Sequence, residues 1–410
     1  MRILVVSEDI PYPNMGGLAK HALNLSRALV RAGHQVDILG GNQNPIEVAG
    51  NEANFGGRFF GELNGHLVGW REISLGTVMP LKRTWKAKRF AQTILRHAAN
   101  YDVIHYHGHI PNVARYIPPE INFVQTRHDQ GSDCVINSRF RNNAICDSTS
   151  PAECARCMTD NPNALQRAVS TVAVVQFRRE VIDGFRRHKT IFVSDMLQRN
   201  LSRTAGPGPW GLTIHNFIDL GALERARNSA DAKHADGEVQ VFIAGKLSPS
   251  KGIEPFLRAL LPHLPANMHV AIAGDGSAEA RLRAEFGSSQ VRFLGWCAPE
   301  ITLKLSAEAD AIVVPSMWED PCPSTIFEGL LLGKATFALA RGGTPELKKY
   351  ASAPGQLRLH DDMESLVQDL IRYSPDLRFE PGAPGLGGAD HAVEKLLQIY
   401  RLPPGQTLAQ

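Results

Sequence analysis

Short apolar runs alternate with amphipathic segments from the N-terminus onward. Residues 3–7 and 35–39 have the continuous apolar composition of strands that are buried on both faces of a sheet. Between them, apolar residues recur at helical spacing, at Ala22, Leu25, Leu29 and Ala32. Gly33 then provides a C-terminal stop. The pattern predicts a strand–helix–strand unit whose helix begins near Ala19.

The same alternation continues along the chain. Further strands are predicted in the first half at residues 103–106, 123–126 and 190–193. In the second half they are predicted at residues 239–244, 268–273, 291–294, 310–314 and 335–340. Helices are expected at about 252–263, 278–286, 300–308 and 325–333. Strands that alternate with helices in this way predict an α/β protein with two consecutive Rossmann-like domains.

Two stretches rich in small, polar or chain-bending residues mark the ends of the second domain. Residues 228–237 read as an exposed connection, and residues 375–390, which are rich in proline and glycine, read as a loose linker before a last helix. We therefore predict a first domain over residues 1–220 and a second over residues 221–391.

One loop in the second domain carries the most chemical information. It follows the strand that ends at Val314, and it places Asp320 before an apolar helix and Glu328 inside that helix. Ligands bind at the carboxyl ends of strands in α/β sheets, so both carboxylates are expected to face the binding cleft. Backbone N–H groups at a helix start hold anions, and carboxylates accept hydrogen bonds from a polyol. The loop predicts a ligand that combines phosphate with sugar; an ordinary strand–loop–helix with solvated acids is the alternative.

Other strand-end loops fit the same ligand. Residues 245–252 place Lys246 and Lys251 between a strand and a helix. Glycine-containing turns follow the next two strands, and Arg-Gly-Gly-Thr-Pro-Glu occupies residues 341–346. In the first domain, Gly16 and Gly17 would let the backbone approach a ligand closely at a helix N-terminus.

Together these loops resemble the motifs of retaining nucleotide-sugar glycosyltransferases of the GT-B fold, glycosyltransferase family 4, also described as glycosyl transferases group 1. Asp320 and Glu328 match two acidic positions separated by seven residues, although the family usually has Glu first. Glu319 is a competing assignment, with eight intervening residues. Lys246 stands where the family usually has Arg, and Pro323 where many relatives have Gly. The resemblance covers the whole second domain in order.

The resemblance implies that a nucleoside-diphosphate sugar binds the second domain and a hydroxyl acceptor the first, across a cleft between them. It implies front-face transfer with retention of configuration, assisted by the leaving phosphate, and no cofactor or divalent metal for catalysis. The acceptor would be a glycan or a lipid-linked glycan of polysaccharide biosynthesis. Residues 392–410 are expected to pack back onto the first domain.

The resemblance also implies roles for single residues. Catalytic roles fall to His128, which follows a strand and would lie near the sugar, and to Asp320, Glu328, Lys246 and Lys251. Both lysines, with the amides of Ser324 and Thr325, would neutralise the diphosphate, while Asp320 orients sugar hydroxyls and Glu328 the ribose. Gly274 and Leu294 lie in loops where the family binds the base and ribose.

Four of the six cysteines fall in one region, at Cys134, Cys146, Cys154 and Cys157. Four thiolates can close a tetrahedral zinc site, and a reducing cytoplasm favours zinc over disulfides. Some glycosyltransferases of the resembled family carry a similar insert, so a structural zinc ion is expected there. Because only one C-x2-C pair is present, four free thiols are the alternative.

The net charge of +3 hides an uneven distribution. Residues 1–220 hold 25 basic against 18 acidic residues, and residues 221–410 hold 19 against 23. Much of the basic excess lies in two clusters interleaved with aromatic residues: Lys82, Arg83, Lys86, Lys88 and Arg89 around Trp85 and Phe90, and Arg178, Arg179, Arg186, Arg187 and Lys189 around Phe177 and Phe185. They would suit an anionic membrane surface or a lipid-diphosphate acceptor, with solvated helix faces as the alternative. Neither has a nucleic-acid motif around it.

No apolar run of 18 residues is present, and the apolar start is too short for a signal peptide. The sequence therefore predicts a cytoplasmic enzyme, with a peripheral position at the inner face of the membrane as a further expectation. Two other functions stay open. A nucleotide-sugar epimerase would use the same donor site without an acceptor, and a non-catalytic scaffold would use the cysteine region as its interaction module.

Overall fold

The chain folds into two compact units. The computed structural model describes residues 1–10, 17–41, 55–63, 79–157, 163–230, 237–377, 379–382 and 387–408, with the backbone alone for residues 79–82. The first unit comprises residues 1–139, 146–215 and 392–410, and the second comprises residues 140–145 and 216–391. Gly16, the side chain of Lys82 and, within the two predicted linkers, residues 231–236, 378 and 383–386 lie outside the described part.

A seven-stranded parallel sheet forms the centre of the first unit, in the order β3-β2-β1-β4-β5-β8-β9. The strands are β1 (Arg2–Ser7), β2 (Gln35–Gly41), β3 (Phe59–Leu63), β4 (Val103–His107), β5 (Phe123–Arg127), β8 (Lys189–Phe192) and β9 (Leu212–Thr213). The helices are α1 (Gly17–Arg31), α3 (Met79–Ala98), α4 (Pro151–Arg156), α5 (Ala164–Phe185), α6 (Asp195–Ala205) and α14 (Ala389–Arg401). Leu4 and Val6 of β1 pack with Phe90 and Ile94 of α3 in one core, since alternate strand residues share a face.

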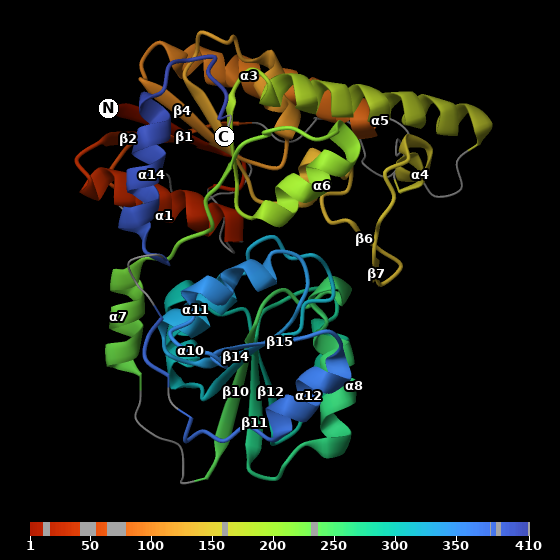
Figure 1. The fold of residues 1–410 in the computed structure, drawn as a ribbon, viewed down its shortest axis with the longest axis vertical. Helices are drawn as coiled ribbons and strands as arrows, with labels where there is room; N and C mark the ends of the chain where they lie inside the picture. The colour runs from red at the N-terminus through yellow and green to blue at the C-terminus, as the bar shows by residue number, and fades with distance from the viewer. Residues whose placement is uncertain are drawn as a thin grey trace. The chain divides into compact units, whose positions relative to one another are not determined.

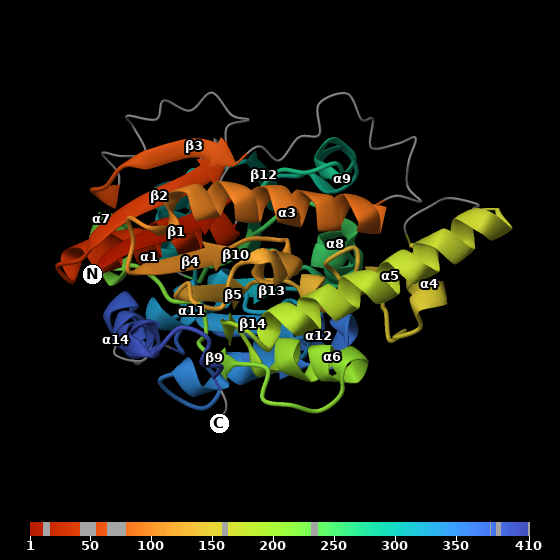
Figure 2. The same ribbon diagram turned by 90° about the horizontal axis from the view of Figure 1, so that it is seen from above.

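Most of α14, the last helix, belongs to the first unit although its sequence follows the second unit. The N-terminal part of α5 extends past the sheet, with α4 beside it (Figures 1 and 2).

The second unit contains a six-stranded parallel sheet in the order β12-β11-β10-β13-β14-β15. The strands are β10 (Val239–Ala244), β11 (Met268–Ala273), β12 (Val291–Gly295), β13 (Ala311–Val314), β14 (Ala335–Leu339) and β15 (Leu357–His360). The helices are α7 (Leu220–Ser229), α8 (Ile253–Leu260), α9 (Glu279–Phe286), α10 (Pro299–Glu308), α11 (Ser324–Leu331) and α12 (Met363–Ile371). Two 3-10 segments, η5 (Pro249–Lys251) and η7 (Thr344–Tyr350), follow β10 and β14. Val241 and Ile243 of β10 pack with Phe256 of α8 and Leu366 of α12.

The predicted architecture of two parallel α/β units is confirmed, with local differences. The single helix expected over residues 252–263 ends at Leu260 and continues as a 3-10 turn, η6 (Leu261–His263). Pro262 explains the change, because proline has no N–H to donate within an α-helix. The edge strands β3, β9 and β15 were not predicted. A short antiparallel pair, β6 (Phe140–Arg141) and β7 (Ala144–Ile145), also lies outside the predicted pattern.

The basic and aromatic clusters are only partly exposed. Phe177 and Phe185 of α5 belong to the core, and Lys189 is 1% exposed in β8, so the second cluster is not the solvent-facing patch that its sequence suggested. Lys189 Nζ donates to Asn122 Oδ1 at 2.7 Å. In the first cluster, Trp85 is 48% exposed. None of the described helices combines the length and apolar character needed to cross a membrane.

Candidate active site

The loops after β10 and β13 meet at the point where the strand order of the second unit reverses. β10 pairs with β11 on one side and with β13 on the other. In an open α/β sheet, ligands bind at the carboxyl ends of the strands at such a reversal. Backbone N–H groups of Met317 and Trp318 donate to the carbonyl of Ser250, which ties the two loops together.

Lys251 and Asp320 form an ion pair across these loops. Lys251 Nζ lies 2.5 Å from Asp320 Oδ2, and the two side chains are 28% and 9% exposed. The ammonium group also lies 5.3 Å from the centre of the Trp318 ring, within the range of a cation–π contact. The structure therefore brings together a predicted phosphate-binding base and a predicted sugar-binding acid, and it leaves the lysine accessible.

Glycines allow this close approach of the loops. Gly252 has φ +68°, and a Cβ there would lie 1.9 Å from the carbonyl oxygen of Pro315. Gly342, in the loop after β14, has φ +58°, and a Cβ there would lie 2.6 Å from the backbone nitrogen of Asp320. Backbone would block a side chain at either position, and both adopt the left-handed conformation that favours glycine. The loop that carries Asp320 is therefore packed against Gly252 at Pro315 and against Gly342 at Asp320.

Helix α11 supplies the remaining acidic residue. It begins at Ser324, after Pro323, and no side chain caps its N-terminus. Ser324 and Thr325 are half-buried there, as expected for amides that could face an anion. Glu328, in the second turn, is 3% exposed. A buried carboxylate needs polar partners, so Glu328 is a fixed group rather than a solvated surface acid.

The donor residues predicted after β10, β11 and β12 lie on the same sheet edge. Gly274 N–H, just past β11, donates to the carbonyl of Gly295 at 2.7 Å, and Gly245 N–H donates to Ala273. Lys246 is exposed in the first of these loops. Leu294, near the end of β12, is 38% exposed. The sheet order therefore brings these residues to the same edge as Lys251 and Asp320.

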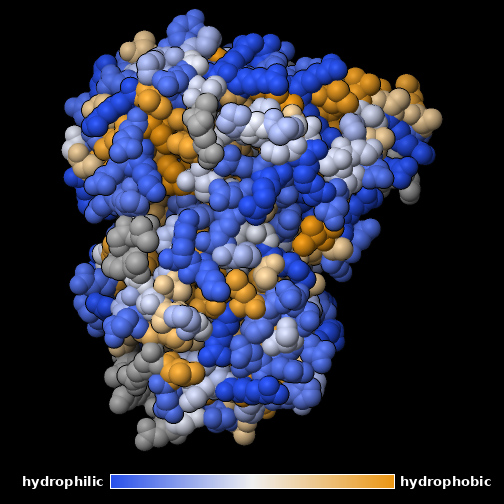
Figure 3. All heavy atoms as spheres, viewed as in Figure 1, coloured by the Kyte–Doolittle hydropathy of each residue, from blue (hydrophilic) through white to orange (hydrophobic). Residues whose placement is uncertain are grey.

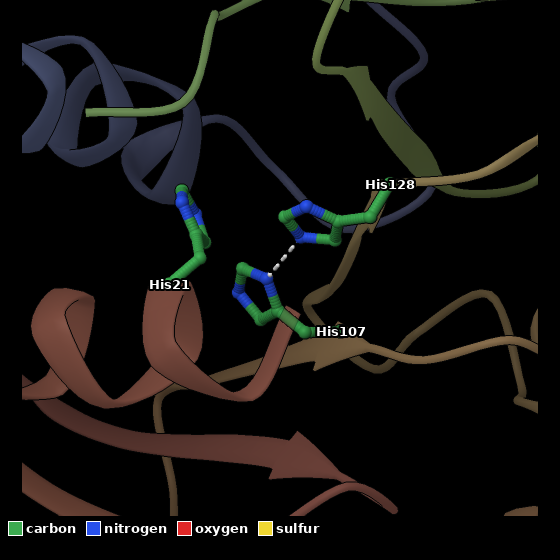
Figure 4. A group of neighbouring side chains, drawn as sticks. All are labelled: His21, His107 and His128. Atoms are coloured by element: carbon green, nitrogen blue, oxygen red, sulfur yellow. Dashed lines mark hydrogen bonds between the residues drawn. The ribbon is translucent and has the colours of Figure 1, made fainter. Parts of the chain in front are cut away.

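A cluster of histidines lies at the carboxyl edge of the first sheet. His21 comes from α1, His107 ends β4 and His128 follows β5, so three elements contribute one ring each (Figure 4). His107 Nδ1 and His128 Nε2 are 3.0 Å apart and share a hydrogen bond. Burial lowers the pKa of His21 to about 3 and holds the pKa values of His107 and His128 well below the usual range. These rings are therefore neutral at pH 7.

Two further histidines adjoin the cluster. His105, with its ring centre 4.0 Å from that of His107, is bonded through Nδ1 to Tyr400 Oη at 2.6 Å and through Nε2 to Thr126 Oγ1 at 2.8 Å. His109 lies between Asp129 and Asp9, at 2.5 and 3.0 Å. Burial alone would lower the pKa of His109, but hydrogen bonds to both carboxylates raise it to about 11, so this ring is cationic.

Sequence reasoning selected His128 but not its partners. His107 was visible as a polar residue at a strand end, and His21 as a polar residue inside an apolar helical pattern. Neither feature of the sequence shows that His21 and His107 lie close together, because their proximity depends on β1 and β4 being neighbours in the sheet. Gly17, the first residue of α1, lies at the start of the same helix as His21.

None of the four clustered cysteines forms a disulfide bond, and all four are half-buried. Cys154 Sγ accepts a hydrogen bond from the Arg178 guanidinium at 3.3 Å, and burial, reinforced by nearby thiols, raises the pKa of Cys154. Among the described residues, only the His21, His107 and His128 group places three or more ligand atoms within 4.8 Å of one another. The four sulfurs thus influence one another electrostatically without being gathered that closely.

Comparisons with known proteins agree with these features. A model described as Glycosyltransferase Family 4 matches residues 15–222, and one described as Glycosyl transferases group 1 matches residues 224–373. The chain is 23% identical over 376 residues to the glycosyltransferase MJ1607 of Methanocaldococcus jannaschii, covering 85% of this chain and 83% of that protein.

Solved structures show the same fold at low sequence identity. Sucrose-phosphate synthase from Thermosynechococcus elongatus has a TM-score of 0.66 at 17% identity, with 98% of each chain covered. Anabaena HepE, solved in complex with UDP, has a TM-score of 0.55 at 17% identity, with 98% of this chain and 96% of that chain covered. Because the family models span both units, the chain belongs to glycosyltransferase family 4 and is a glycosyltransferase of the GT-B fold.

Proposed function

We propose that this enzyme transfers a hexose-type sugar from a nucleoside diphosphate to a hydroxyl acceptor, with retention of configuration. The observation that carries the proposal is the Lys251–Asp320 pair at the strand reversal of the second unit. A diphosphate needs cationic and N–H partners, and a sugar needs hydrogen-bond acceptors. The partners of the diphosphate would be Lys251, Lys246 and the N-terminus of α11. The hydrogen-bond acceptor for the sugar would be Asp320.

In this mechanism, charge stabilisation of the leaving diphosphate supplies most of the rate. The bond between the anomeric carbon and the phosphate oxygen breaks, and the acceptor oxygen bonds to the same face of the sugar while its proton passes to the leaving phosphate. Lys251 and Lys246 stabilise the negative charge that develops on that phosphate. The buried Glu328 holds the ribose hydroxyls, and the neutral His128 ring hydrogen-bonds to the sugar. None of these steps requires a metal ion or an organic cofactor.

The donor class has support from relatives. HepE has been solved with UDP, with UDP and glucose, and with UDP-glucose, at TM-scores of 0.55, 0.58 and 0.57. A protein of the cps region of Klebsiella pneumoniae, 25% identical over 190 residues, covers 46% of each chain. The HepE complexes favour a nucleotide-sugar donor, and we assign the acceptor to glycans or lipid-linked glycans of polysaccharide biosynthesis.

A screen of nucleotide sugars tests this proposal. The purified enzyme should slowly hydrolyse one nucleoside-diphosphate sugar, and NMR of the first-formed sugar should show the anomeric configuration of the donor. Inverted product would contradict retention. Conversion of the donor into an epimer, without release of nucleoside diphosphate, would identify the chain as a nucleotide-sugar epimerase. No turnover of any donor together with no nucleotide binding would favour a scaffold.

We place the enzyme in the cytoplasm, at an anionic membrane surface that helix α5 contacts. Leu165, Val169 and Val172 follow one another at helical spacing on α5 and are 74%, 40% and 68% exposed. Figure 3 shows apolar side chains gathered on the outer end of this helix. Arg167 and Arg179 are exposed on the same helix, and residues 164–179 include no acidic residue. An apolar stripe on a helix that also carries exposed bases suits the headgroup region of anionic lipids.

Vesicle flotation tests the membrane contact. Protein should float with vesicles that contain phosphatidylglycerol and should float less with vesicles of phosphatidylcholine alone. Val172→Glu should abolish flotation, whereas Leu377→Glu, which changes an exposed apolar residue of the second unit, should not. Equal flotation of wild type and Val172→Glu would contradict this role of α5.

A further inference from the structure

The histidine cluster of the first unit contains more than the proposed glycosyl transfer requires, because that transfer uses only His128. His21, His107 and His128 each offer one ring nitrogen, and these nitrogens lie within 4.8 Å of one another. The ring centres are 4.7 Å apart for His21 and His128, 5.4 Å for His21 and His107, and 5.3 Å for His107 and His128. The three ring centres thus form a nearly equilateral triangle.

That triangle matches the geometry of three imidazoles on one metal ion. With metal–nitrogen distances of about 2.0–2.1 Å and tetrahedral angles, ligand nitrogens lie about 3.3 Å apart and ring centres about 5 Å apart. The observed separations of the ring centres fall around 5 Å. The distance of 3.0 Å between His107 Nδ1 and His128 Nε2 is close to the separation expected for two ligand nitrogens. The rings are therefore already at the spacing that a shared ion requires.

The surrounding groups fix which histidines are available. His105 is closest to His107, but both of its ring nitrogens are already bonded, to Tyr400 and Thr126. His107 Nε2 is buried and has no hydrogen-bond partner among the described residues. The hydrogen bond of this ring is the one between Nδ1 and His128, which lies inside the cluster. Imidazole binds a metal ion through a neutral ring nitrogen.

We propose that His21, His107 and His128 bind one divalent transition-metal ion of the zinc class, with the remaining coordination position open to water or a small anion. Three histidines with an open position are a common ligand set for zinc. The ion would bind His128 Nε2 in place of the hydrogen bond to His107 Nδ1, and it would hold the ring that contacts the sugar in the proposed transfer mechanism, on which this consequence rests. Metal binding and sugar transfer would therefore exclude each other, and the site would make the enzyme sensitive to zinc.

Cobalt titration tests this site without any measurement of transfer. Protein prepared without a polyhistidine tag and treated with chelator should bind, besides any ion held by the four clustered cysteines, about one equivalent of Co²⁺ whose visible absorption bands are typical of four- or five-coordinate cobalt and persist in Cys157→Ser. Zn²⁺ should displace the cobalt and remove the bands. His21→Ala should weaken binding by at least about tenfold, and His263→Ala, which removes an exposed histidine of the second unit, should leave binding unchanged.

Two outcomes would overturn the proposal. One is the absence of visible cobalt bands, or identical bands and affinity in wild type, His21→Ala and His128→Asn. The other is a cobalt spectrum dominated by near-ultraviolet thiolate charge transfer that disappears in Cys157→Ser, which would locate the only bound ion at the cysteines. Thermal unfolding of each variant shows whether it is folded, and His128→Asn, which changes the most exposed ring of the three, serves if His21→Ala is unstable. Because the readout is a spectrum, failure here leaves the proposed transfer activity untouched.

Discussion

The hydroxyl of Tyr400, in the last helix, lies 2.6 Å from Nδ1 of His105, a residue 295 positions earlier in the chain. Both side chains are almost completely buried. Helix α14 is therefore bound to the first unit by a specific polar contact behind the histidine cluster, as well as by its apolar face. The Asn122 side chain adds a second such contact by donating to the Tyr400 carbonyl at 2.8 Å.

Tyr400→Phe should reduce the free energy of unfolding of the first unit by about 1–3 kcal/mol. The substitution keeps the ring but leaves the buried His105 Nδ1 without its partner. Urea unfolding followed by tryptophan fluorescence measures the change. Tyr373→Phe removes a hydroxyl from the second unit and should leave the first-unit transition where it is. An unchanged midpoint in Tyr400→Phe would show that the hydrogen bond contributes nothing to docking of α14.

Lys251→Ala should lower turnover by about 2–4 kcal/mol of transition-state stabilisation, roughly 30- to 1,000-fold. The reason is that the lysine meets a negative charge that grows as the sugar–phosphate bond breaks, so donor affinity should fall less than kcat. Steady-state kinetics with the identified donor measures both. Lys304→Ala, which also removes an ion-paired lysine of the second unit, is the matched control. Wild-type turnover in Lys251→Ala would remove this residue from the mechanism.

Glu328→Gln should raise the donor KM more than it lowers kcat, because a ribose contact is made equally in the ground and transition states. Asp320→Asn should do the opposite. The pair of variants also tests which acid occupies the first motif position, since Glu319 precedes Asp320 directly. If Glu319→Gln is damaging and Asp320→Asn is silent, Glu319 rather than Asp320 contacts the sugar.

Lys189 should make the stability of the first unit depend on pH in the alkaline range. Burial lowers its pKa to about 8, whereas the unfolded chain should titrate near 10.5. Between these values the unfolded state binds more protons, so the contribution of Lys189 to stability rises with pH. The difference in unfolding free energy between wild type and Lys189→Met should therefore grow from pH 8 to 10.5, by on the order of 1–3 kcal/mol. A difference that stays constant over this range would contradict the assignment.

Cys134, Cys146, Cys154 and Cys157 should together hold one structural zinc ion, which would draw the four half-buried thiols inward. Chelation should then loosen the region around α4 while the second unit stays folded, because metal binding contributes to folding only where the ligands are. Elemental analysis of untagged protein measures the zinc. Cys154→Ser should lose it and Cys297→Ser should keep it. Less than about a tenth of an equivalent in wild type would leave four ordinary thiols.

The sequence was sufficient to predict which loops matter, but not how they meet. Buried strands followed by polar residues are visible as pattern, so Lys251 and Asp320 could each be placed at a strand end. Their contact could not be predicted from spacing, because it requires β10 and β13 to be neighbours despite two intervening strands. The resemblance to a family supplied that information indirectly.

Burial was the other property that the local pattern could not provide. Phe177 and Lys189 looked like parts of a basic surface because neighbouring arginines surround them in sequence. Helix α5 is long enough to be interior at one end and exposed at the other, and only tertiary packing separates the two. The apolar stripe at Leu165, Val169 and Val172 was overlooked for the same reason, since apolar residues at helical spacing usually face a core.

The requirement for glycine at Gly252 and Gly342 constrains how this active site can be altered. Backbone meets backbone at both positions, so the loops after β10, β13 and β14 form one interlocked assembly rather than three independent segments. A chimaera that borrowed only one of these loops from a relative would bring a mismatched partner into direct collision with the other two. Attempts to exchange donor specificity between relatives should therefore graft all three loops together, or change side chains and leave every loop length intact.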